Sequence, residues 1–333
     1  MVVDVKMKTR DAALDIAKGT LIVLMLIGHM EIPNWLREVI YSFHMPAFIF
    51  FSGYCFKAKA CDDIKACIIN LAKTFCVPYL IWAVFYIIMQ KEDILFKIKN
   101  ILCGMSNVDK VLENRTPVGQ VYFLLLLLLV RLIYVVIYKC VKDEVVRTIV
   151  IVGISLFGAW LGKNGFWLPW SLDCSLYALV YYHMGHLIKK ADGVSYVENN
   201  RWCYFVLFPI WFVMIALGGM ELYPRQYGNY VITILGAVCA CVLLYIGCRI
   251  VAARFMKTLV NGLVEVGKHT LSILLVHTIF GGYIAIFIVK LFRLLGIGDW
   301  MSLIYVLVIL LQVVLGIVWG KIYDKACKNI FKY

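Results

Sequence analysis

The sequence predicts an all-α protein that crosses a membrane many times. Of its 333 residues, 63% are hydrophobic and 16% are charged, whereas soluble domains have about 45–50% apolar and about 25% charged residues. The apolar residues form continuous runs such as VYFLLLLLLVRLIYVVIY (Val121–Tyr138), unlike the alternating strands of membrane β-barrels. Such runs suit helices of about 20 residues that span a bilayer. We therefore expect a polytopic transmembrane helix bundle forming one membrane domain over residues 1–333.

About ten apolar segments are candidates for these spans, each near the length that a transmembrane helix needs. The fifth is the weakest because it is short and has Arg147 near its start. The second is also compatible with a half-embedded segment. In chain order the expected spans are Leu14–Met30, Val39–Phe56, Ile68–Met89, Gln120–Tyr138, Val145–Leu161, Trp167–Ile188, Cys203–Met220, Val231–Val251, Leu271–Leu291 and Met301–Gly320.

Lys and Arg residues orient the bundle, because they concentrate in cytoplasmic loops. With the N-terminus inside, the inner segments hold about twice as many of these residues as the outer ones, which favours two cytoplasmic termini. The connection Gln90–Gly119 is then external, and its segment DILFKIKNIL is amphipathic enough to lie on the membrane surface. The net charge of +13 therefore reflects topology and attraction to anionic lipid rather than nucleic-acid binding. We expect a bacterial-type cytoplasmic membrane.

The twelve cysteines show no paired spacing typical of a zinc site or a disulfide framework. We therefore expect no metal and no bound cofactor. The sequence leaves a homo-oligomer open as an assembly state.

Charged residues within spans are costly in lipid and often mark a functional cavity. The first span, LDIAKGTLIVLMLIGHM, contains Asp15, Lys18 and His29. Asp15 and Lys18 are three residues apart and share a helix face. His29 lies about 20° from three full turns after Lys18 and about 16 Å further along the axis. The span therefore carries one polar stripe that runs from its cytoplasmic end towards its outer half.

A second histidine, His44, lies in the segment FHMP at the mouth of the next apolar run. Proline is tolerated in the first turn of a helix, so FHMP is interpreted as a helix start that places His44 at the depth of His29. Each residue alone has a simpler explanation, because Lys18 can snorkel to the surface and histidines occur at interfaces. The shared face and depth favour a functional cluster with a histidine as general base.

The sequence resembles the acyltransferase-3 family of membrane acyltransferases, and within it the fucose 4-O-acetylase-like branch. The segments that carry the resemblance are LDIAKGTLIVLMLIGHM, IYSFHMPAFIFFSGYCFK and KTFCVPYLIW, with looser matches at GQVYFLLLLLLV, YYHMGHLIKK and VGKHTLSILLVH. Together they cover essentially the whole chain. The resemblance implies transfer of acyl groups, usually acetyl from cytoplasmic acyl-CoA, to hydroxyls of extracytoplasmic or lipid-linked sugars.

The resemblance also implies which residues form the site. The family's basic residue and histidine with ten residues between them fall on Lys18 and His29, and its Phe-His-Met-Pro histidine falls on His44. The family's Ser-Gly-Tyr motif falls on Ser52, Gly53 and Tyr54. The basic residue before its Pro-Tyr pair falls on Lys73. This chain departs from the family at Tyr122, where tryptophan is expected, and at Arg131, where an acidic or neutral residue is expected.

Transfer of an acyl group from a thioester to an alcohol needs a base for the hydroxyl and a donor for the oxyanion. We expect His29 to be the base, with Asp15 and Lys18 aligning a polar path. His44 would orient His29 or protonate the departing thiolate. Lys18 or Lys73 would meet the CoA phosphates as point charges. Direct transfer and a covalent acyl-His29 intermediate both stay open.

Two further residues within spans are candidates for the site. Asp173, near the outer end of the sixth span, is expected to bind sugar hydroxyls or to pair with Arg131. His277, within the ninth span, is a candidate for lining the cavity. The expected partners are thus acyl-CoA, a sugar acceptor and membrane lipid.

Two other classes of protein suit the same pattern. A transporter or flippase for an envelope precursor also has many spans and polar residues at the midline, but the sequence shows no symmetry of inverted repeats. An inactive scaffold in an envelope assembly is the third alternative. Binding or hydrolysis of acyl-CoA by the purified protein would separate the enzyme from both.

Overall fold

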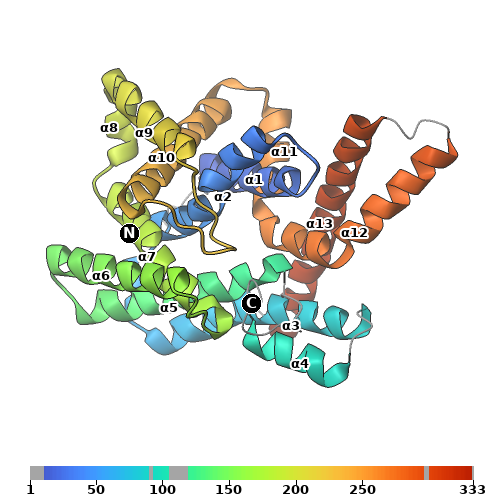
Figure 1. Cartoon of the computed structure of the whole chain (residues 1–333), viewed down its shortest axis with the longest axis horizontal. Coiled ribbons are helices and arrows are strands. Elements are labelled where there is room, and N and C mark those ends of the chain that lie inside the picture. The colour runs from blue at the N-terminus through green and yellow to red at the C-terminus, as the bar shows by residue number, and fades with distance from the viewer. Residues whose placement is uncertain (1–10, 90–92, 105–118, 296–299, 332–333) are drawn as a thin grey trace, which may run out of the picture.

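The structure is a computed structural model that describes residues 11–89, 93–104, 119–295 and 300–331. Within these residues the regular structure is helical, apart from one isolated bridge between Glu221 and Gln226. The helices are α1 (Ala12–Gly28), α2 (Asn34–Tyr54), α3 (Ile64–Met89), α4 (Ile94–Cys103), α5 (Tyr122–Cys140), α6 (Glu144–Lys163), α7 (Leu172–Lys190), α8 (Gly193–Asn199), α9 (Tyr204–Ala216), α10 (Tyr230–Arg254), α11 (Lys257–Lys268), α12 (Thr270–Leu294) and α13 (Met301–Phe331). Figure 1 shows α12 and α13 side by side at one edge of the bundle.

Each of the ten expected spans falls on one helix of the described chain. Six of these helices, α3, α5, α6, α10, α12 and α13, are long and apolar enough to cross a membrane. The weak fifth segment is thus a complete helix, α6, of 20 residues. Of the others, α1 and α9 have 17 and 13 residues, and α2 and α7 contain more polar residues. The protein is an all-α membrane protein, and the side on which each helix end lies stays a prediction from the loop charges.

The second span begins earlier than its sequence indicates, and the interpretation of FHMP as a helix start is wrong. Helix α2 begins at Asn34, so His44 and Pro46 lie in its interior. Pro46 has no N–H, which leaves the carbonyl of Ser42 without its usual partner within the helix. The hydroxyl of Ser42 accepts a hydrogen bond from the indole N–H of Trp211 at 3.2 Å. This contact ties the proline-containing turn of α2 to α9.

The amphipathic segment after the third span forms helix α4. Lys97 turns inward and donates a hydrogen bond to the carbonyl of Ile87, near the end of α3, at 2.8 Å. Leu95 and Leu102 are 74% and 67% exposed, so an apolar face points away from the protein, as expected for a helix on a membrane surface. The rest of the expected external connection Gln90–Gly119, at residues 90–92 and 105–118, lies outside the described residues.

Two pairs of helices approach closely at glycines. A Cβ atom added to Gly267 of α11 would overlap the backbone carbonyl of Asp15 in α1, and one added to Gly19 would lie 2.7 Å from the carbonyl oxygen of Leu263. Likewise, a Cβ atom at Gly53 of α2 would overlap the carbonyl of Tyr182 in α7. Small residues allow backbones to approach in this way in membrane proteins. These contacts fix α1 and α2, which form two walls of the site described below.

The contact of α1 with α11 predicts an unequal response of two glycines on α11. Gly267→Ala should destabilise the protein by about 1–3 kcal/mol, because a backbone carbonyl cannot move aside. The matched control is Gly262→Ala on the same helix, where an added Cβ meets nothing within 4 Å and alanine is the better helix former. Thermal unfolding of both variants in detergent measures the difference. Equal unfolding temperatures would show that α1 and α11 do not pack through Gly267.

Candidate active site

A cavity of about 630 Å³ lies inside the bundle. Helices α1, α2, α3, α5 and α12 line it, together with Gly267 and Lys268 at the end of α11 and a short segment of the connection between α9 and α10. On α1, the residues that face it are Lys18, Ile22, Met25 and His29. The cavity thus follows about 16 Å of α1, from the charged end of the helix to the histidine. The structure brings the expected polar stripe onto one wall.

The end of the cavity near Lys18 is cationic. Lys18 forms an ion pair with Asp15 at 3.9 Å, and Asp15 itself is 2% exposed. Arg131 and Lys268 line the same cavity, and both Lys18 and Arg131 act electrostatically on Cys55. Lys268 follows Gly267, the residue of α11 that meets Asp15. Three cations from α1, α5 and α11 therefore gather at this end.

The side chain of Lys268 is placed by a second set of charges on α11. Glu265 lies 3.3 Å from Lys268 and 3.1 Å from Lys321 of α13. Hydrogen bonds from Lys321 and then Lys268 lower the pKa of Glu265, so this carboxyl is ionised at neutral pH. Sequence reasoning missed Lys268 because its neighbourhood depends on α11 folding against α1.

His29 occupies the other end of the cavity. It caps the C-terminus of α1, and its side chain is accessible rather than packed in the core. Its Nδ1 lies 2.7 Å from the carbonyl oxygen of Met25. A carbonyl can only accept a hydrogen bond, so Nδ1 carries the proton in the neutral ring and Nε2 keeps its lone pair. This is the arrangement that a general base requires.

Two other histidines and a tyrosine surround His29. The ring of His277 meets that of His29 edge-on, with centroids 5.0 Å apart, and Nδ1 of His277 lies 2.8 Å from Oε1 of Gln312. Tyr41 lies 6.4 Å from the ring of His29 and 5.1 Å from that of His44. The nearest histidine ring to His29 is therefore His277, while Tyr41 lies between His29 and His44.

The remaining expected residues divide into two groups. Ser52 and Arg131 line the cavity. Lys73 is half-buried next to Thr74 and Phe75, which line the wall, but is not itself part of it. Tyr54 packs on the far side of α2, 5.2 Å from the ring of Tyr245. Asp173 and His277 also lie outside the lining residues of the described chain.

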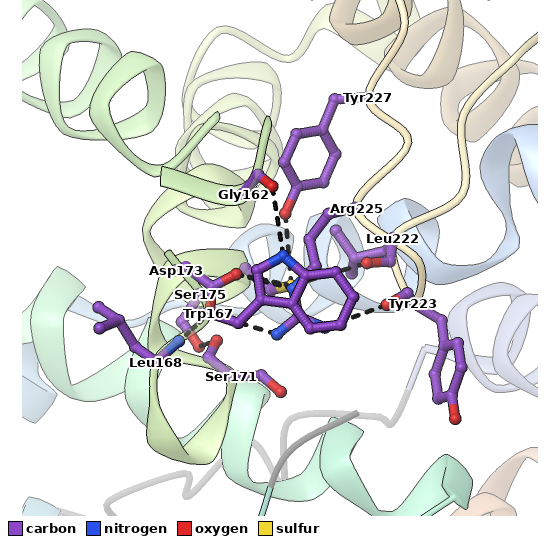
Figure 2. Close-up of polar contacts among 11 residues, drawn as sticks. Gly162, Trp167, Leu168, Ser171, Asp173, Ser175, Leu222, Tyr223, Arg225 and Tyr227 are labelled. Atoms are coloured by element: carbon purple, nitrogen blue, oxygen red, sulfur yellow. Dashed lines mark hydrogen bonds and ion pairs between the residues drawn. The ribbon is translucent and has the colours of Figure 1, made fainter. Parts of the chain in front are cut away.

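Asp173 belongs to the network in Figure 2. Its two carboxylate oxygens accept hydrogen bonds from Nε and Nη2 of Arg225 at 2.9 and 3.3 Å, and the backbone N–H of Leu168 adds a third at 3.0 Å. Both side chains of the pair are buried, and the guanidinium lies over the ring of Trp167 at 4.0 Å. The expected alternative, a pair between Asp173 and Arg131, is wrong. Its partner, Arg225, lies in the connection between α9 and α10, and no pattern in the sequence indicates that this connection meets α7.

Residues 217–229, which connect α9 to α10, fold back over α7 through this ion pair. Tyr227 stacks on Tyr177 of α7 with ring centroids 3.9 Å apart. As a result Glu221, Leu222 and Tyr223 face the cavity at its histidine end. Sequence reasoning missed these residues. The only signal for them was that a short connection between two apolar segments contains the acidic Glu221 and the aromatic Tyr223.

Glu221 is the carboxylate among the described residues that line the cavity. Burial raises its pKa, while the charge of Arg37 acts in the opposite direction. Glu221 also acts electrostatically on Tyr41, which places it beside the histidine cluster.

The fold and the cavity define a polytopic membrane protein whose bundle encloses a polar, histidine-containing site. A family model described as an acyltransferase domain matches residues 11–321. The match covers most of the chain, so the chain belongs to the acyltransferase-3 family and is a membrane acyltransferase. No curated protein and no solved structure matches it significantly.

The buried pair predicts a structural role for Asp173. Asp173→Asn should destabilise the protein by about 3–5 kcal/mol, because it leaves the buried guanidinium of Arg225 without a counter-ion. The control is Glu198→Gln, which breaks the exposed pair between Glu198 and Arg249 and should cost at most about 1 kcal/mol. Unfolding in detergent measures both. Similar small losses in the two variants would contradict a structural role for Asp173.

Proposed function

We propose that this protein transfers an acyl group, acetyl in the simplest case, from cytoplasmic acyl-CoA to a hydroxyl of a cell-surface or lipid-linked sugar. The observation that carries the proposal is one cavity with a cationic end, an apolar middle and a histidine end. Acyl-CoA has the matching order of parts: anionic phosphates, a long uncharged arm and a terminal thioester. Membership of an acyltransferase family favours this reaction over transport.

The cationic end supports binding of the donor phosphates. Lys18, Arg131 and Lys268 come from three helices and face one space, and charged hydrogen bonds to phosphate are among the stronger polar contacts. Lys73, next to the wall, stays a candidate for the same task. By the loop charges, this end faces the cytoplasm, where acyl-CoA is made available. The setting proposed is a bacterial-type cytoplasmic membrane.

The middle of the cavity suits the uncharged arm of the donor. Side chains from four helices make it apolar, and a mostly apolar lining with few polar groups is typical of small-molecule sites. The lining residues of this part include Ile22, Met25, Phe48, Leu127, Leu271 and Leu274. With its phosphates at the cationic end, the donor places its thioester beside His29.

His29 then supports the chemical step. Its Nε2 takes the proton of the acceptor hydroxyl as the hydroxyl oxygen attacks the thioester carbonyl carbon. Collapse of the tetrahedral intermediate breaks the carbon–sulfur bond and leaves an ester on the acceptor. The proton passes from the His29 imidazolium to the thiolate, which leaves as free CoA, and His44 stays a candidate for orienting this end of the site. The hydrogen bond from Nδ1 of His29 to Met25 keeps Nε2 directed to this task.

The histidine end supports a sugar as the acceptor. The rings of Tyr41, Tyr122 and Tyr223 contribute to its wall, with Gln120 and Glu221 as polar groups. Tyr122 and Tyr223 meet edge-on with centroids 5.5 Å apart. Aromatic faces with a few hydrogen-bonding groups suit a ring that has apolar faces and hydroxyls around its edge.

The role of His29 predicts the same loss from two different substitutions. His29→Ala and His29→Gln should each lower acyl transfer by about 10²–10⁴-fold, because neither side chain accepts a proton near neutral pH. Transfer from labelled acyl-CoA in membranes, with the amount of protein measured alongside, gives the ratio. His186→Gln is the control, since His186 packs against Phe56 outside the cavity. Activity of the His29→Gln variant close to that of the wild type would show that His29 positions the substrate and does not abstract the proton.

The cationic end of the cavity predicts that substitutions of Lys268 and Lys73 raise KM for acyl-CoA to different extents. Lys268→Gln should raise KM for acyl-CoA by about tenfold, because one charged hydrogen bond to phosphate is lost. Lys268→Arg should have a smaller effect, since it keeps the charge. Lys73→Gln should change KM for acyl-CoA less than Lys268→Gln, because Lys73 is not part of the wall. The reverse order would place the phosphates beside Lys73, one of the two lysines that the sequence suggests for this task.

A further inference from the structure

Glu221 has an unusual position for an ionisable group. It lies in the cavity wall near the histidine cluster and is only partly exposed. Its backbone pairs with that of Gln226, with N–H···O distances of 2.8 and 3.0 Å. Within the described part of the chain no donor hydrogen-bonds its carboxylate, and Arg37 acts on it through charge alone. The carboxylate therefore faces the cavity with its hydrogen-bonding capacity available to a ligand.

The wall that presents Glu221 is rigid, because both of its neighbours are buried against α7. Met220 and Leu222 are each 2% exposed. The hydroxyls of Tyr177 and Tyr181 contact the sulfur of Met220 at 3.8 and 3.3 Å, and the thiol of Cys174 contacts the carbonyl of Leu222 at 3.6 Å. The backbone of Glu221 is therefore anchored beside the cavity, and its side chain lines the wall.

This end of the cavity also limits the charge that a ligand can carry. Lys18, Arg131 and Lys268 lie at the opposite end, about 16 Å away along α1. An anionic acceptor would therefore meet the Glu221 carboxylate in the wall, while Arg37, the cation that acts on Glu221 through its charge, is not part of the wall. A carboxylate has two oxygens that accept hydrogen bonds, so it can hold two hydroxyls of one sugar while a third reaches Nε2 of His29.

We infer that Glu221 determines acceptor specificity, by accepting hydrogen bonds from hydroxyls of an uncharged sugar and by repelling sugars that carry a carboxylate. This rests on the proposed sugar acyl transfer and adds a substrate class to it. Glu221 positions the acceptor, and His29 performs the proton transfer. The ion pair of Arg225 with Asp173 sets the place of Glu221 through the backbone of residues 221–225.

The test compares Glu221→Gln with the wild-type protein in detergent or vesicles. Labelled acyl-CoA is the donor, and the acceptor probes are methyl glycosides of neutral hexoses and of the matching hexuronic acids. The wild type should acylate the neutral glycosides in preference to the hexuronates. Glu221→Gln should raise KM for neutral glycosides about tenfold, because charge-assisted hydrogen bonds become neutral ones. It should also lower the ratio of kcat/KM for neutral glycosides to kcat/KM for hexuronates, because the repelling charge is gone. KM for acyl-CoA should not change.

The control is Glu31→Gln, which removes an exposed carboxylate that accepts a hydrogen bond from Tyr305 and lies outside the cavity wall. It should leave KM for the glycosides unchanged. An unchanged acceptor KM in Glu221→Gln, or a wild-type preference for hexuronates, would overturn the role of Glu221 alone. A wild-type protein that consumes acyl-CoA but acylates no glycoside would instead overturn the sugar acceptor of the proposed function.

Discussion

The buried ion pair between Asp173 and Arg225 is the contact on which the outer wall of the cavity depends. Neither charge is stable in lipid or in a dry core without the other. Asp173 is fixed near the start of α7, so Arg225 must come to it, and the connection between α9 and α10 folds inward as a result. Arg225 adopts a positive φ of 59° in doing so. Together with the burial of Met220 and Leu222 against α7, this pair holds Glu221 and Tyr223 at the cavity.

Helix α1 links this outer wall to the opposite end of the site. One face carries Lys18 and His29, and the backbone on another side meets α11 at Gly19 and Gly267. The tight contact brings Lys268 to the cationic end of the cavity. A polar stripe that would be costly in lipid is thus enclosed by protein along its length, and the enclosed space becomes the site.

This arrangement gives a physical account of acyl transfer within a membrane. The cations and the histidine cluster are far apart, so the charged part of a donor and the reacting group occupy different depths. In the proposed reaction, the apolar middle holds the uncharged arm of the donor and so places the thioester at the histidine end. The carbonyl of Met25 fixes the tautomer of His29, and Tyr41 separates His29 from His44. In our proposal, the aromatic rings and Glu221, on the wall that the ion pair helps to build, recognise the acceptor.

The sequence by itself determined the helical membrane architecture, because long apolar runs admit few other structures in lipid. It also determined the alignment of Lys18 with His29, since helical periodicity fixes which residues share a face. Only the tertiary structure decided that α2 begins at Asn34, because a proline within a helix and one at its start leave the same local pattern. It likewise decided the partner of Asp173 and the places of Glu221 and Lys268. These contacts join residues far apart in the chain, 52 positions for Arg225 and Asp173, and no local periodicity records which helix meets which.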